Sequence, residues 1–256
     1  MNDRASSAPL PAQDHRSESP VVLLAAGLGS RLGALTERLP KALIAVAGQP
    51  LLAYAVDFAR AVTRTEIVVV GGFEFERVAA EVARLALPVT LVRNHDFRDG
   101  NLVSLLAARA AIGDRGFLLM NVDHIYRPAI AGVAAAPADD VTAFIDHDRT
   151  LGADDMKVAR DGQGRISLIS KQLATFDCGY VGMTRVPASS AARYWAEVDA
   201  ALAAEGRAIA VERILGRLAA AGRPPLCRDI SGHGWLEVDL PEERDHAERV
   251  LTSGTW

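Results

Sequence analysis

The sequence predicts an α/β fold of three layers, in which a mixed, mostly parallel β-sheet lies between helices on both of its faces. Through the first half of the chain, short apolar runs rich in Val, Ile and Leu alternate with longer helix-like runs. This alternation is typical of parallel strands joined by crossover helices. In the second half, shorter strand-like runs and two long helix-like runs follow. They make the predicted sheet mixed and add a small β-hairpin lid.

Five apolar runs of the first half are expected to be buried strands, because they are continuous and partly β-branched. They occupy residues 21–24, 66–71, 88–92, 116–120 and 141–145, and helices fit between them at 51–62, 74–85 and 102–111. In open α/β sheets, ligands bind beyond the carboxyl ends of the strands. Polar residues that directly follow these strands, such as Asn94 and Asp123, are therefore candidates for a site.

The second half is expected to begin with the hairpin. Its two runs, 156–160 and 165–169, flank a turn sequence of Asp and Gly at 161–164, and it would lean over the site. The remaining predicted elements are a strand at 178–183, helices at 187–204 and 208–221, short strands at 226–230 and 235–238, and a helix at 241–251. Pro241 suits the first turn of that last helix.

Composition bounds the class of protein. The 256 residues suffice for one α/β domain. The first 19 residues are rich in Ser, Pro, Asp and Ala, so we expect a disordered tail at 1–19 and a single domain at 20–256. A net charge of −4 without a basic tract argues against nucleic acid as a partner. No apolar run approaches the ~20 residues that span a bilayer, and two cysteines give no disulfide framework. We therefore expect a cytoplasmic protein without membrane insertion.

The loop after the first strand carries the strongest functional signal. Its glycines, Gly27 and Gly29, let backbone amides approach a ligand closely, and concave rows of amides bind anions such as phosphate. Arg31 adds a planar fork for phosphate oxygens, and Lys41 adds a point charge. The dinucleotide fingerprint requires glycine where Leu32 stands, and the Gly-Lys-Ser/Thr of a P-loop is absent. The glycines alone would also fit a βα turn that binds nothing.

Acidic residues follow two of the predicted strands. Asp123 follows the fourth strand, and Glu237 and Asp239 alternate along a late strand, which places both on one face. Mg²⁺ prefers one or two protein carboxylates together with phosphate oxygens. These three residues are therefore candidate metal ligands. A turn aspartate, a solvated strand face and a helix cap are the alternative interpretations.

The string from Leu24 to Leu43 resembles the signature of the sugar-nucleotide pyrophosphorylases: Gly-x-Gly-Ser/Thr-Arg-Leu, then Leu-Thr, then Pro-Lys. Further runs resemble the cytidylyltransferases for phosphocholine and inositol 1-phosphate within that family. They are Asn101-x-x-Ser104-Leu105, Asp123-His124-x-Tyr126, Lys171-x-Leu173 and Phe176-Asp177-Cys178. The resemblance covers about residues 21–250. Tyr180 and Val181 depart from the Asp-Thr that the inositol enzymes tend to carry before the glycine.

The resemblance implies a fold of the nucleotide-diphospho-sugar transferase type and a Mg²⁺-dependent transfer of a nucleotidyl group to a phosphorylated small molecule. Arg31 and Lys41 are implied as catalytic residues, Asp123 and Asp239 as Mg²⁺ ligands with Glu237 beside them, and Lys41, Lys171 and Asp177 as acceptor contacts. The implied nucleotide contacts are Leu24, Ala25, Ala26, Gly27, Gly29, Ser30, Arg31, Asn94, Asn101 and Ser104.

On this resemblance, CTP is the expected nucleotide. The expected acceptor is a cyclitol, polyol or amino-alcohol phosphate such as inositol 1-phosphate or phosphocholine, and a phosphonate or a sugar 1-phosphate stays open as an acceptor. Two alternatives stay open: a guanylyl- or uridylyltransferase acting on a sugar 1-phosphate, and a catalytically silent homologue that binds a nucleotide or phosphosugar. A silent homologue would be expected to lose Lys41 or a carboxylate, and this chain keeps them. A homo-oligomer is compatible with the sequence.

Overall fold

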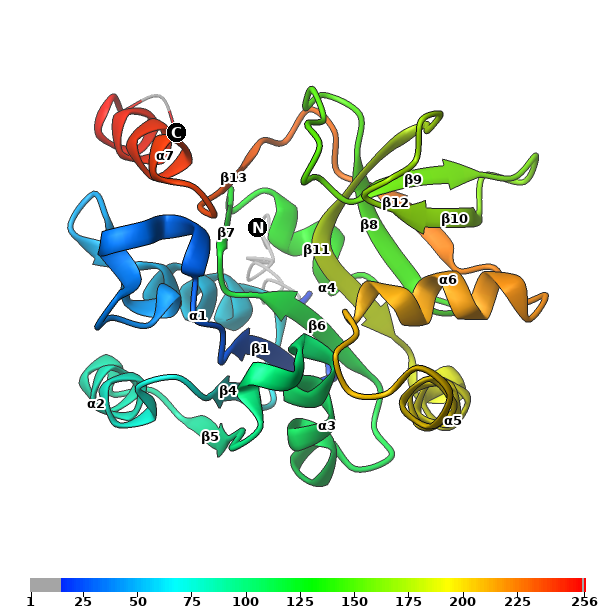
Figure 1. Cartoon of the computed structure of the whole chain (residues 1–256), viewed down its shortest axis with the longest axis horizontal. Coiled ribbons are helices and arrows are strands. Elements are labelled where there is room, and N and C mark those ends of the chain that lie inside the picture. Colours follow the sequence, from blue (N-terminus) through cyan, green and yellow to red (C-terminus); the bar gives the residue numbers. More distant parts are fainter. Residues whose placement is uncertain (1–14, 255) are drawn as a thin grey trace, which may run out of the picture.

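The computed structural model describes residues 15–254 and 256, and within them a large mixed sheet forms the centre of the molecule (Figure 1). Its strands are β1 (Val21–Ala25), β4 (Ile67–Gly71), β5 (Val89–Arg93), β6 (Phe117–Asn121), β8 (Thr142–Asp146), β9 (Lys157–Arg160), β10 (Ile166–Ser170), β11 (Cys178–Val186) and β12 (Leu226–Asp229). The strand order is β10-β9-β11-β6-β1-β4-β5, with β8 paired to β11 and β12 paired to β8.

The sheet has a parallel part and an antiparallel part. β1 pairs in parallel with β4 and β6, and β4 pairs in parallel with β5. β11 runs antiparallel to β6, β8 and β9. Its pairing with β8 shifts register between Tyr180 and Thr184, around Gly182 with a φ of 70°. A left-handed glycine at this point bends the strand. The mixed sheet predicted from the sequence is thereby confirmed.

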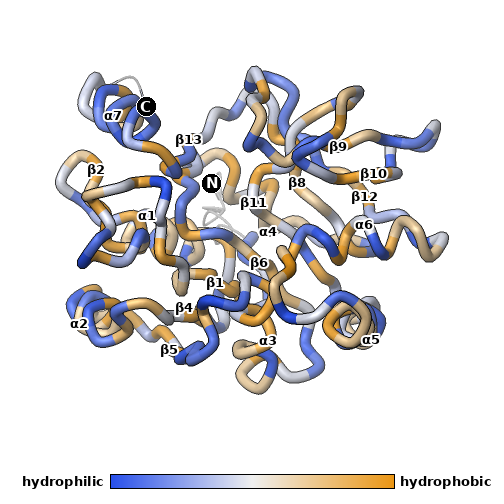
Figure 2. Tube along the Cα trace, in the orientation of Figure 1, coloured by the Kyte–Doolittle hydropathy of each residue, from blue (hydrophilic) through white to orange (hydrophobic). Residues whose placement is uncertain are grey.

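Helices cover both faces of the sheet. They are α1 (Leu51–Val62), α2 (Phe75–Leu85), α3 (Asn101–Ile112), α4 (Ile130–Ala135), α5 (Ala188–Glu205), α6 (Glu212–Ala220) and α7 (Pro241–Thr252). One apolar core joins the sheet to α3, α5 and α6, and a second joins the opposite face to α1, α2 and α4. Successive residues of β1 alternate between these cores, because side chains of a strand alternate in direction. Figure 2 shows the central strands as hydrophobic and the outer helices as mixed.

Smaller elements complete the fold. β2 (Ala45–Val46) pairs with β3 (Gln49–Pro50), and β7 (His124–Tyr126) pairs with β13 (Trp235–Glu237). Three 3-10 helices, η1 (Ser30–Thr36), η2 (Lys41–Leu43) and η3 (Phe97–Asp99), lie in connecting segments. A third apolar core packs Leu32, Ile125 and Leu236 with Ala247 of α7. It ties the segment after the glycine loop to the last helix.

Two regions differ from the expectation. The predicted hairpin forms as β9 and β10, but it is continuous with the main sheet because β9 also pairs with β11. Of the predicted tail, residues 1–14 lie outside the described residues. Ser17 is described, and its backbone N–H donates to Val62 O at 2.7 Å while its carbonyl accepts from Arg64 N–H at 3.1 Å. Residues 15–19 therefore pack against the end of α1, whereas disorder was expected there.

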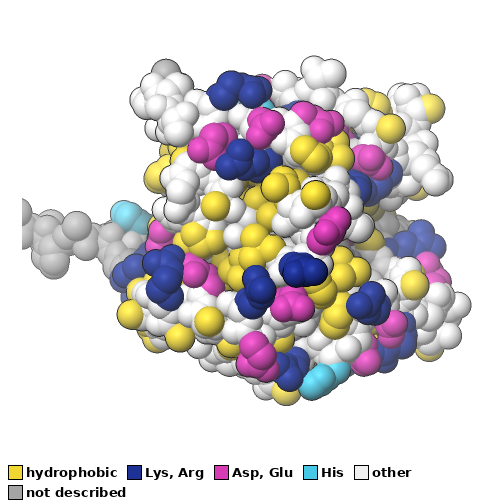
Figure 3. Space-filling view, turned by 60° about the vertical axis from the view of Figure 1, so that its left-hand side comes forward, with side chains coloured by type: hydrophobic (Ala, Val, Ile, Leu, Met, Phe, Trp, Pro, Cys, Tyr) yellow, Lys and Arg dark blue, Asp and Glu magenta, His cyan; other side chains and the backbone are white. Residues whose placement is uncertain are grey.

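Positively and negatively charged side chains alternate on the surface and do not form separate patches on the face shown in Figure 3. On the face in Figure 3, Lys and Arg side chains lie beside Asp and Glu side chains. The structure also contains exposed ion pairs, such as those of Arg207 with Asp96 and Asp99. Among the residues that the structure describes, no helix has the length and apolar character needed to cross a membrane.

We predict that Phe117→Ala lowers the free energy of unfolding by about 3–5 kcal/mol. Phe117 is fully buried and packs its ring 5.8 Å from Tyr194 and 5.6 Å from Trp195, so truncation leaves a cavity in the core below α5. Urea denaturation measures the change. As a control, Leu168→Ala, at a residue that is 58% exposed, should change it by no more than about 0.5 kcal/mol. Equal changes in both variants would contradict the described core.

Candidate nucleotidyl-transfer site

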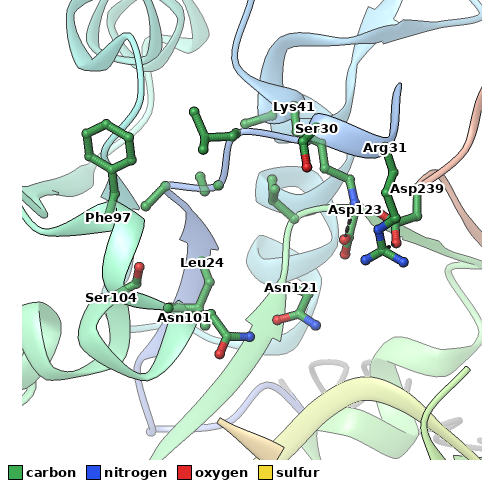
Figure 4. A pocket seen from close by; sticks show the side chains of 18 of the residues that line it. Leu24, Ser30, Arg31, Lys41, Phe97, Asn101, Ser104, Asn121, Asp123 and Asp239 are labelled. Atoms are coloured by element: carbon green, nitrogen blue, oxygen red, sulfur yellow. Dashed lines mark hydrogen bonds and ion pairs between the residues drawn. The ribbon is translucent and has the colours of Figure 1, made fainter. Parts of the chain in front are cut away.

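The candidate site begins at the loop that leaves β1. This loop forms one wall of a cavity of about 310 Å³ beyond the carboxyl ends of β1 and β6. Figure 4 shows Ser30, Arg31 and Lys41 along one side of it, with Asn101 and Ser104 on the opposite side. The cavity is lined by Leu24, Ala25, Ala26, Gly27, Leu28, Gly29, Ser30, Arg31, Lys41, Ala42, Phe97, Arg98, Gly100, Asn101, Ser104, Asn121, Val122, Asp123 and Asp239.

A second cavity, of about 200 Å³, adjoins the first. The two share Arg31, Asn101, Asn121, Asp123 and Asp239 in their walls. The rest of the second wall is His124, Asp154, Asp155, Met156, Lys171, Tyr180, Gly182, Ala210, Glu212 and Glu237. Most of these residues come from the second half of the chain. The site thus consists of two adjoining compartments that meet at a shared group of charged and amide side chains.

Lys41 joins the two aspartates at this junction. Its Nζ donates to Asp123 Oδ2 and to Asp239 Oδ1, both at 2.5 Å, and Arg31 Nη2 lies 2.5 Å from the other oxygen of Asp239. Lys41 is 8% exposed, whereas the Arg31 side chain is 44% exposed. Two cations and two carboxylates thus form one ionic group at the boundary of the two cavities (Figure 4).

Pairing between distant strands brings the two aspartates together. Asp123 follows β6 and precedes β7, and Asp239 follows β13, which pairs with β7. Val238 N–H donates to Asp123 O at 2.9 Å. A carboxylate oxygen of Glu243 accepts from the backbone N–H of Asp239 at 2.8 Å, which fixes the turn into α7. The backbone therefore sets the separation of the two carboxylates before any ligand binds.

The charges at this junction shift one another's pKa. Burial opposes the charge of Asp123, but Lys41 and His124 outweigh it and hold the pKa of Asp123 well below its ordinary value. Burial likewise opposes the charge of Lys41, and the two carboxylates outweigh it and raise its pKa. The His124 ring, 2.6 Å from Asp123, has a raised pKa because this carboxylate outweighs its burial. Mutual pairing keeps the buried group charged.

Gly29 allows the loop to pass close to Lys41. Its φ is 67°, in the left-handed region that favours glycine, and an added Cβ would lie 2.8 Å from the Lys41 Cβ. The hydroxyl of Thr36 donates to Gly29 O at 2.7 Å and holds this conformation. The threonine of the Leu-Thr in the sequence signature therefore has a structural role here.

The predicted nucleotide contacts fall into two groups. The first group lines the first cavity: Leu24, Ala25, Ala26, Gly27, Gly29, Ser30, Arg31, Asn101 and Ser104. Asn94 is buried behind this wall, and its Nδ2 donates to Ser104 Oγ at 3.0 Å. Asn94 therefore positions Ser104, whereas direct contact with the nucleotide was predicted.

The residues predicted to bind the acceptor or the metal do not all lie in the same place. Lys171 and Glu237 line the second cavity. Glu237 accepts from Arg149 Nη1 at 2.6 Å and stands apart from the two aspartates that Lys41 joins. Asp177 is exposed and lines neither cavity, and its carboxylate accepts from the backbone N–H of Arg160 at 2.6 Å. This contact stabilises the hairpin, so Asp177 has a structural partner at the place where an acceptor contact was predicted.

Asn121 and Glu212 are among the lining residues that the sequence-based set lacked. Asn121 ends β6 and lines both cavities, and its position directly after a buried strand was a usable signal. Glu212 lines the second cavity from the start of α6. Nothing in the local sequence distinguishes it from other glutamates in the first turn of a helix.

Asp123 and Asp239 offer two carboxylates to one cation, which is the protein ligand set that Mg²⁺ prefers when phosphate supplies the remaining oxygens. The cation that they share in this structure is the Lys41 ammonium. Within residues 15–254 and 256, no group of three or more His, Cys, Asp or Glu side chains is placed to hold a metal by itself. The residues therefore fit a divalent ion that arrives with a phosphorylated ligand.

This combination of fold and site defines the class of protein as a nucleotidyltransferase. Residues 21–221 match the MobA-like NTP transferase domain, and the chain belongs to that family. The fold matches the inositol-1-phosphate CTP transferase from T. maritima, with a TM-score of 0.78 and 17% identity over 92% of this chain and 97% of the other. It also matches the CTP:phosphocholine cytidylyltransferase from Streptococcus pneumoniae, with a TM-score of 0.74 and 20% identity over 91% and 99%.

Curated relatives point in the same direction. The bifunctional IPC transferase and DIPP synthase of Rubrobacter xylanophilus is 31% identical over 243 residues, which cover 90% of this chain and 51% of the relative. The CMP-5'-(3-aminopropyl)phosphonate synthase of Streptomyces rubellomurinus is 31% identical over 254 residues, 89% of this chain and 38% of the relative. The chain thus spans about half, or less, of the length of these relatives.

We predict that Lys41→Met lowers the free energy of unfolding by about 3–5 kcal/mol at pH 7, because it leaves two buried carboxylates without their shared cation. The pKa of Asp123 is depressed, so its pairing stabilises the native protein above pH 3.8, its ordinary pKa, and loses this effect as pH falls further. The difference between wild type and variant should therefore shrink on acidification. Urea denaturation between pH 7 and pH 3 measures it.

The matched control is Lys171→Met, at an exposed lysine of the same site. It should change the free energy of unfolding by no more than about 0.5 kcal/mol at any of these pH values. A Lys41 variant as stable as this control at pH 7 would show that the ionic group contributes nothing to the fold.

Proposed function

We propose that the chain transfers a cytidylyl group from CTP to a small phosphorylated alcohol or a phosphonate and releases pyrophosphate. The observation that supports this most strongly is the meeting of two cavities at Arg31, Asp123 and Asp239, with Lys41 paired to both aspartates. A reaction that joins two phosphorylated molecules needs two compartments and a charged group at their boundary. The first cavity would hold CTP and the second the acceptor.

In the proposed reaction, an oxygen of the acceptor phosphate attacks the α-phosphorus of CTP in line with the leaving group. A new P–O bond forms as the bond between the α-phosphorus and the bridging oxygen breaks, and that oxygen leaves with pyrophosphate. Such transfers require little covalent chemistry from the protein. Catalysis then depends on positioning and on neutralising the charge of the phosphates.

The chain's own groups suit these tasks. The backbone amides around Gly27, Gly29 and Ser30, together with Arg31, would hold the β- and γ-phosphates. Lys41 lines the first cavity beside the two aspartates that both cavities share, and it would bind the α-phosphate as charge develops on it. Lys171 would hold the acceptor phosphate from the other side. Because Lys41 and Arg31 are already fixed by the aspartates, little reorganisation is needed when phosphates arrive.

Mg²⁺ is the proposed cofactor, with Asp123 and Asp239 as its protein ligands. When bound, it would neutralise phosphate charge and orient the two reacting groups. The finding that the two carboxylates share one cation even without ligand supports this assignment. Glu237, which is paired with Arg149, lines the second cavity together with these two aspartates and would be the neighbouring acid.

Cytosine and a phosphorylated cyclitol, polyol or amino alcohol are proposed on the sequence resemblance and on the names of the similar proteins. The reaction would take place in the cytoplasm, where CTP is made. A guanylyl- or uridylyltransferase would use the same residues for the phosphates and differ only in the contacts to the base.

The proposal predicts pyrophosphate release only with CTP when five nucleotides are crossed with four acceptors in the presence of Mg²⁺. The nucleotides are CTP, UTP, GTP, ATP and dTTP, and the acceptors are inositol 1-phosphate, phosphocholine, 2-aminoethylphosphonate and glucose 1-phosphate. A coupled pyrophosphate assay measures the rate. Turnover with another nucleotide would contradict the assignment of cytosine as the base. Nucleotide binding without turnover for any pair would favour a catalytically silent homologue.

A second prediction concerns Asp123. Asp123→Asn removes one charge from the proposed ion site and should lower kcat by at least about 100-fold, in the range found for single electrostatic groups in active sites. Circular dichroism would verify that the variant folds. Asp114→Asn, at an exposed aspartate between α3 and β6, is the control and should keep wild-type kcat. An Asp123→Asn enzyme with wild-type turnover would disprove the metal assignment.

A further inference from the structure

Glu212 is a buried acid in the acceptor cavity that the proposed mechanism does not use. It is the first residue of α6, is 8% exposed, and lines the second cavity together with Lys171 and Tyr180. A carboxylate is almost never buried in a protein unless something pairs with it. Its surroundings therefore indicate what kind of ligand group it would meet.

The carboxylate is held in place by neighbouring elements. Asn101 Oδ1 accepts from the backbone N–H of Val211 at 2.8 Å, and Leu102 N–H donates to Ile209 O at 3.3 Å. These bonds fasten the segment before Glu212 to the start of α3. Asn121 lies beside the carboxylate from the end of β6. Glu212 thus belongs to a fixed wall rather than to a mobile loop.

Glu212 differs from the other acids of this cavity in its charge partners. Asp123 and Asp239 share Lys41, and Asp155 and Glu237 share Arg149 at 3.3 and 2.6 Å. Asp154 lies 3.9 Å from Arg31 and is largely exposed. In the part of the chain that the structure describes, no cation lies within 4.0 Å of the Glu212 carboxylate, and burial raises its pKa. Lys171 acts on it only from a greater distance.

Binding of an acceptor phosphate would change the charges around Glu212. If Lys171 binds that phosphate, its charge no longer compensates Glu212, and the phosphate adds negative charge to the same compartment. A cation on the acceptor itself would restore the balance, because a buried carboxylate is stable when it is paired and hydrogen-bonded.

The cavity wall also distinguishes between kinds of cation. A quaternary ammonium is bound by the open faces of aromatic rings. The rings in this wall are His124 and Tyr180. His124 is stacked 5.2 Å from Trp235 and 5.8 Å from Tyr126, so neighbouring rings cover it, and Tyr180 is 7% exposed with its hydroxyl bonded to Thr184 at 2.8 Å. A carboxylate without such faces suits a primary ammonium, which donates hydrogen bonds.

We propose that Glu212 is a specificity-determining residue that binds a primary ammonium group on the acceptor, which is therefore an aminoalkyl phosphate or aminoalkylphosphonate. The inference rests on the proposed function for the position of the acceptor phosphate. Phosphate and phosphonate present the same charged oxygens to Lys171, and the test contains both.

The test compares acceptors that differ at one end. They are 2-aminoethyl phosphate, 2-aminoethylphosphonate, 2-hydroxyethyl phosphate of the same length, and phosphocholine with three methyl groups on nitrogen. For the full chain with CTP and Mg²⁺, kcat/KM should be at least about tenfold higher for 2-aminoethyl phosphate than for 2-hydroxyethyl phosphate, as expected for a hydrogen bond between charged groups. The ratio of the phosphate to the phosphonate shows which of the two is the better acceptor.

The variant Glu212→Gln keeps the shape of the side chain and removes its charge. It should reduce this preference for the ammonium acceptor to about one. A general loss of activity cancels in the ratio, so damage to the fold does not imitate the effect. The control is Glu76→Gln, at an exposed glutamate in the first turn of α2, and it should keep the wild-type preference.

Dissociation constants for the same acceptors, measured by isothermal titration calorimetry, distinguish failure of the proposed function from failure of the proposed role of Glu212. If no pair turns over but the ammonium acceptor binds more tightly to wild type and not to Glu212→Gln, the proposed function fails and the role of Glu212 stands. Equal or better use of 2-hydroxyethyl phosphate or phosphocholine by wild type would overturn the inference. An unchanged preference in Glu212→Gln, or no binding of any acceptor, would overturn it as well.

Discussion

The ammonium of Lys41 between Asp123 and Asp239 is the interaction on which the site depends. The three residues are far apart in the chain, with separations of 82 and 198 positions from Lys41 to its two partners. A buried charge without a partner is costly. Removing one member of a buried ion pair is therefore more destabilising than replacing the whole pair with apolar residues. The protein can therefore bury these charges only when the glycine loop, the centre of the sheet and the last strand have all reached their places. The site therefore depends on the same long-range contacts that hold the fold together.

The rest of the structure supplies what this ionic group requires. β1 and β6 are neighbours in the sheet, so the loop after one and the aspartate after the other meet at one edge. The β7–β13 pair brings the C-terminal segment to the same edge, and the small core around Leu32, Ile125 and Leu236 keeps it there. Gly29 lets the loop approach Lys41 without a steric clash. Packing and backbone hydrogen bonds thus hold a group of charges that would otherwise favour exposure to water.

The local elements and the wall of the first cavity were predictable, because they are encoded in contiguous residues. The helix predicted at 51–62 ends where α1 ends, and the glycine loop, Lys41 and Asp123 line one cavity. The acceptor side was less predictable, since long-range pairing determines it. Asp177 turns to the backbone of Arg160 and Glu237 to Arg149, and neither partner is visible in the sequence pattern. Glu212 escaped notice because an acid in the first turn of a helix is ordinary, and only the tertiary structure shows that this one is buried.

The two cavities draw on different lengths of the chain, and this has a consequence for how such a protein can change. Apart from Asp239, the wall of the first cavity comes from residues 24–123, whereas the residues found only in the second cavity come, His124 aside, from residues 154–237. Substitutions in the later region can alter the shape and charge offered to an acceptor while the phosphate loop stays intact. For the proposed reaction, this division would let evolution or protein engineering exchange one acceptor for another without rebuilding the part of the site that binds the nucleotide. The shared residues at the boundary are the part that must stay constant through such exchanges.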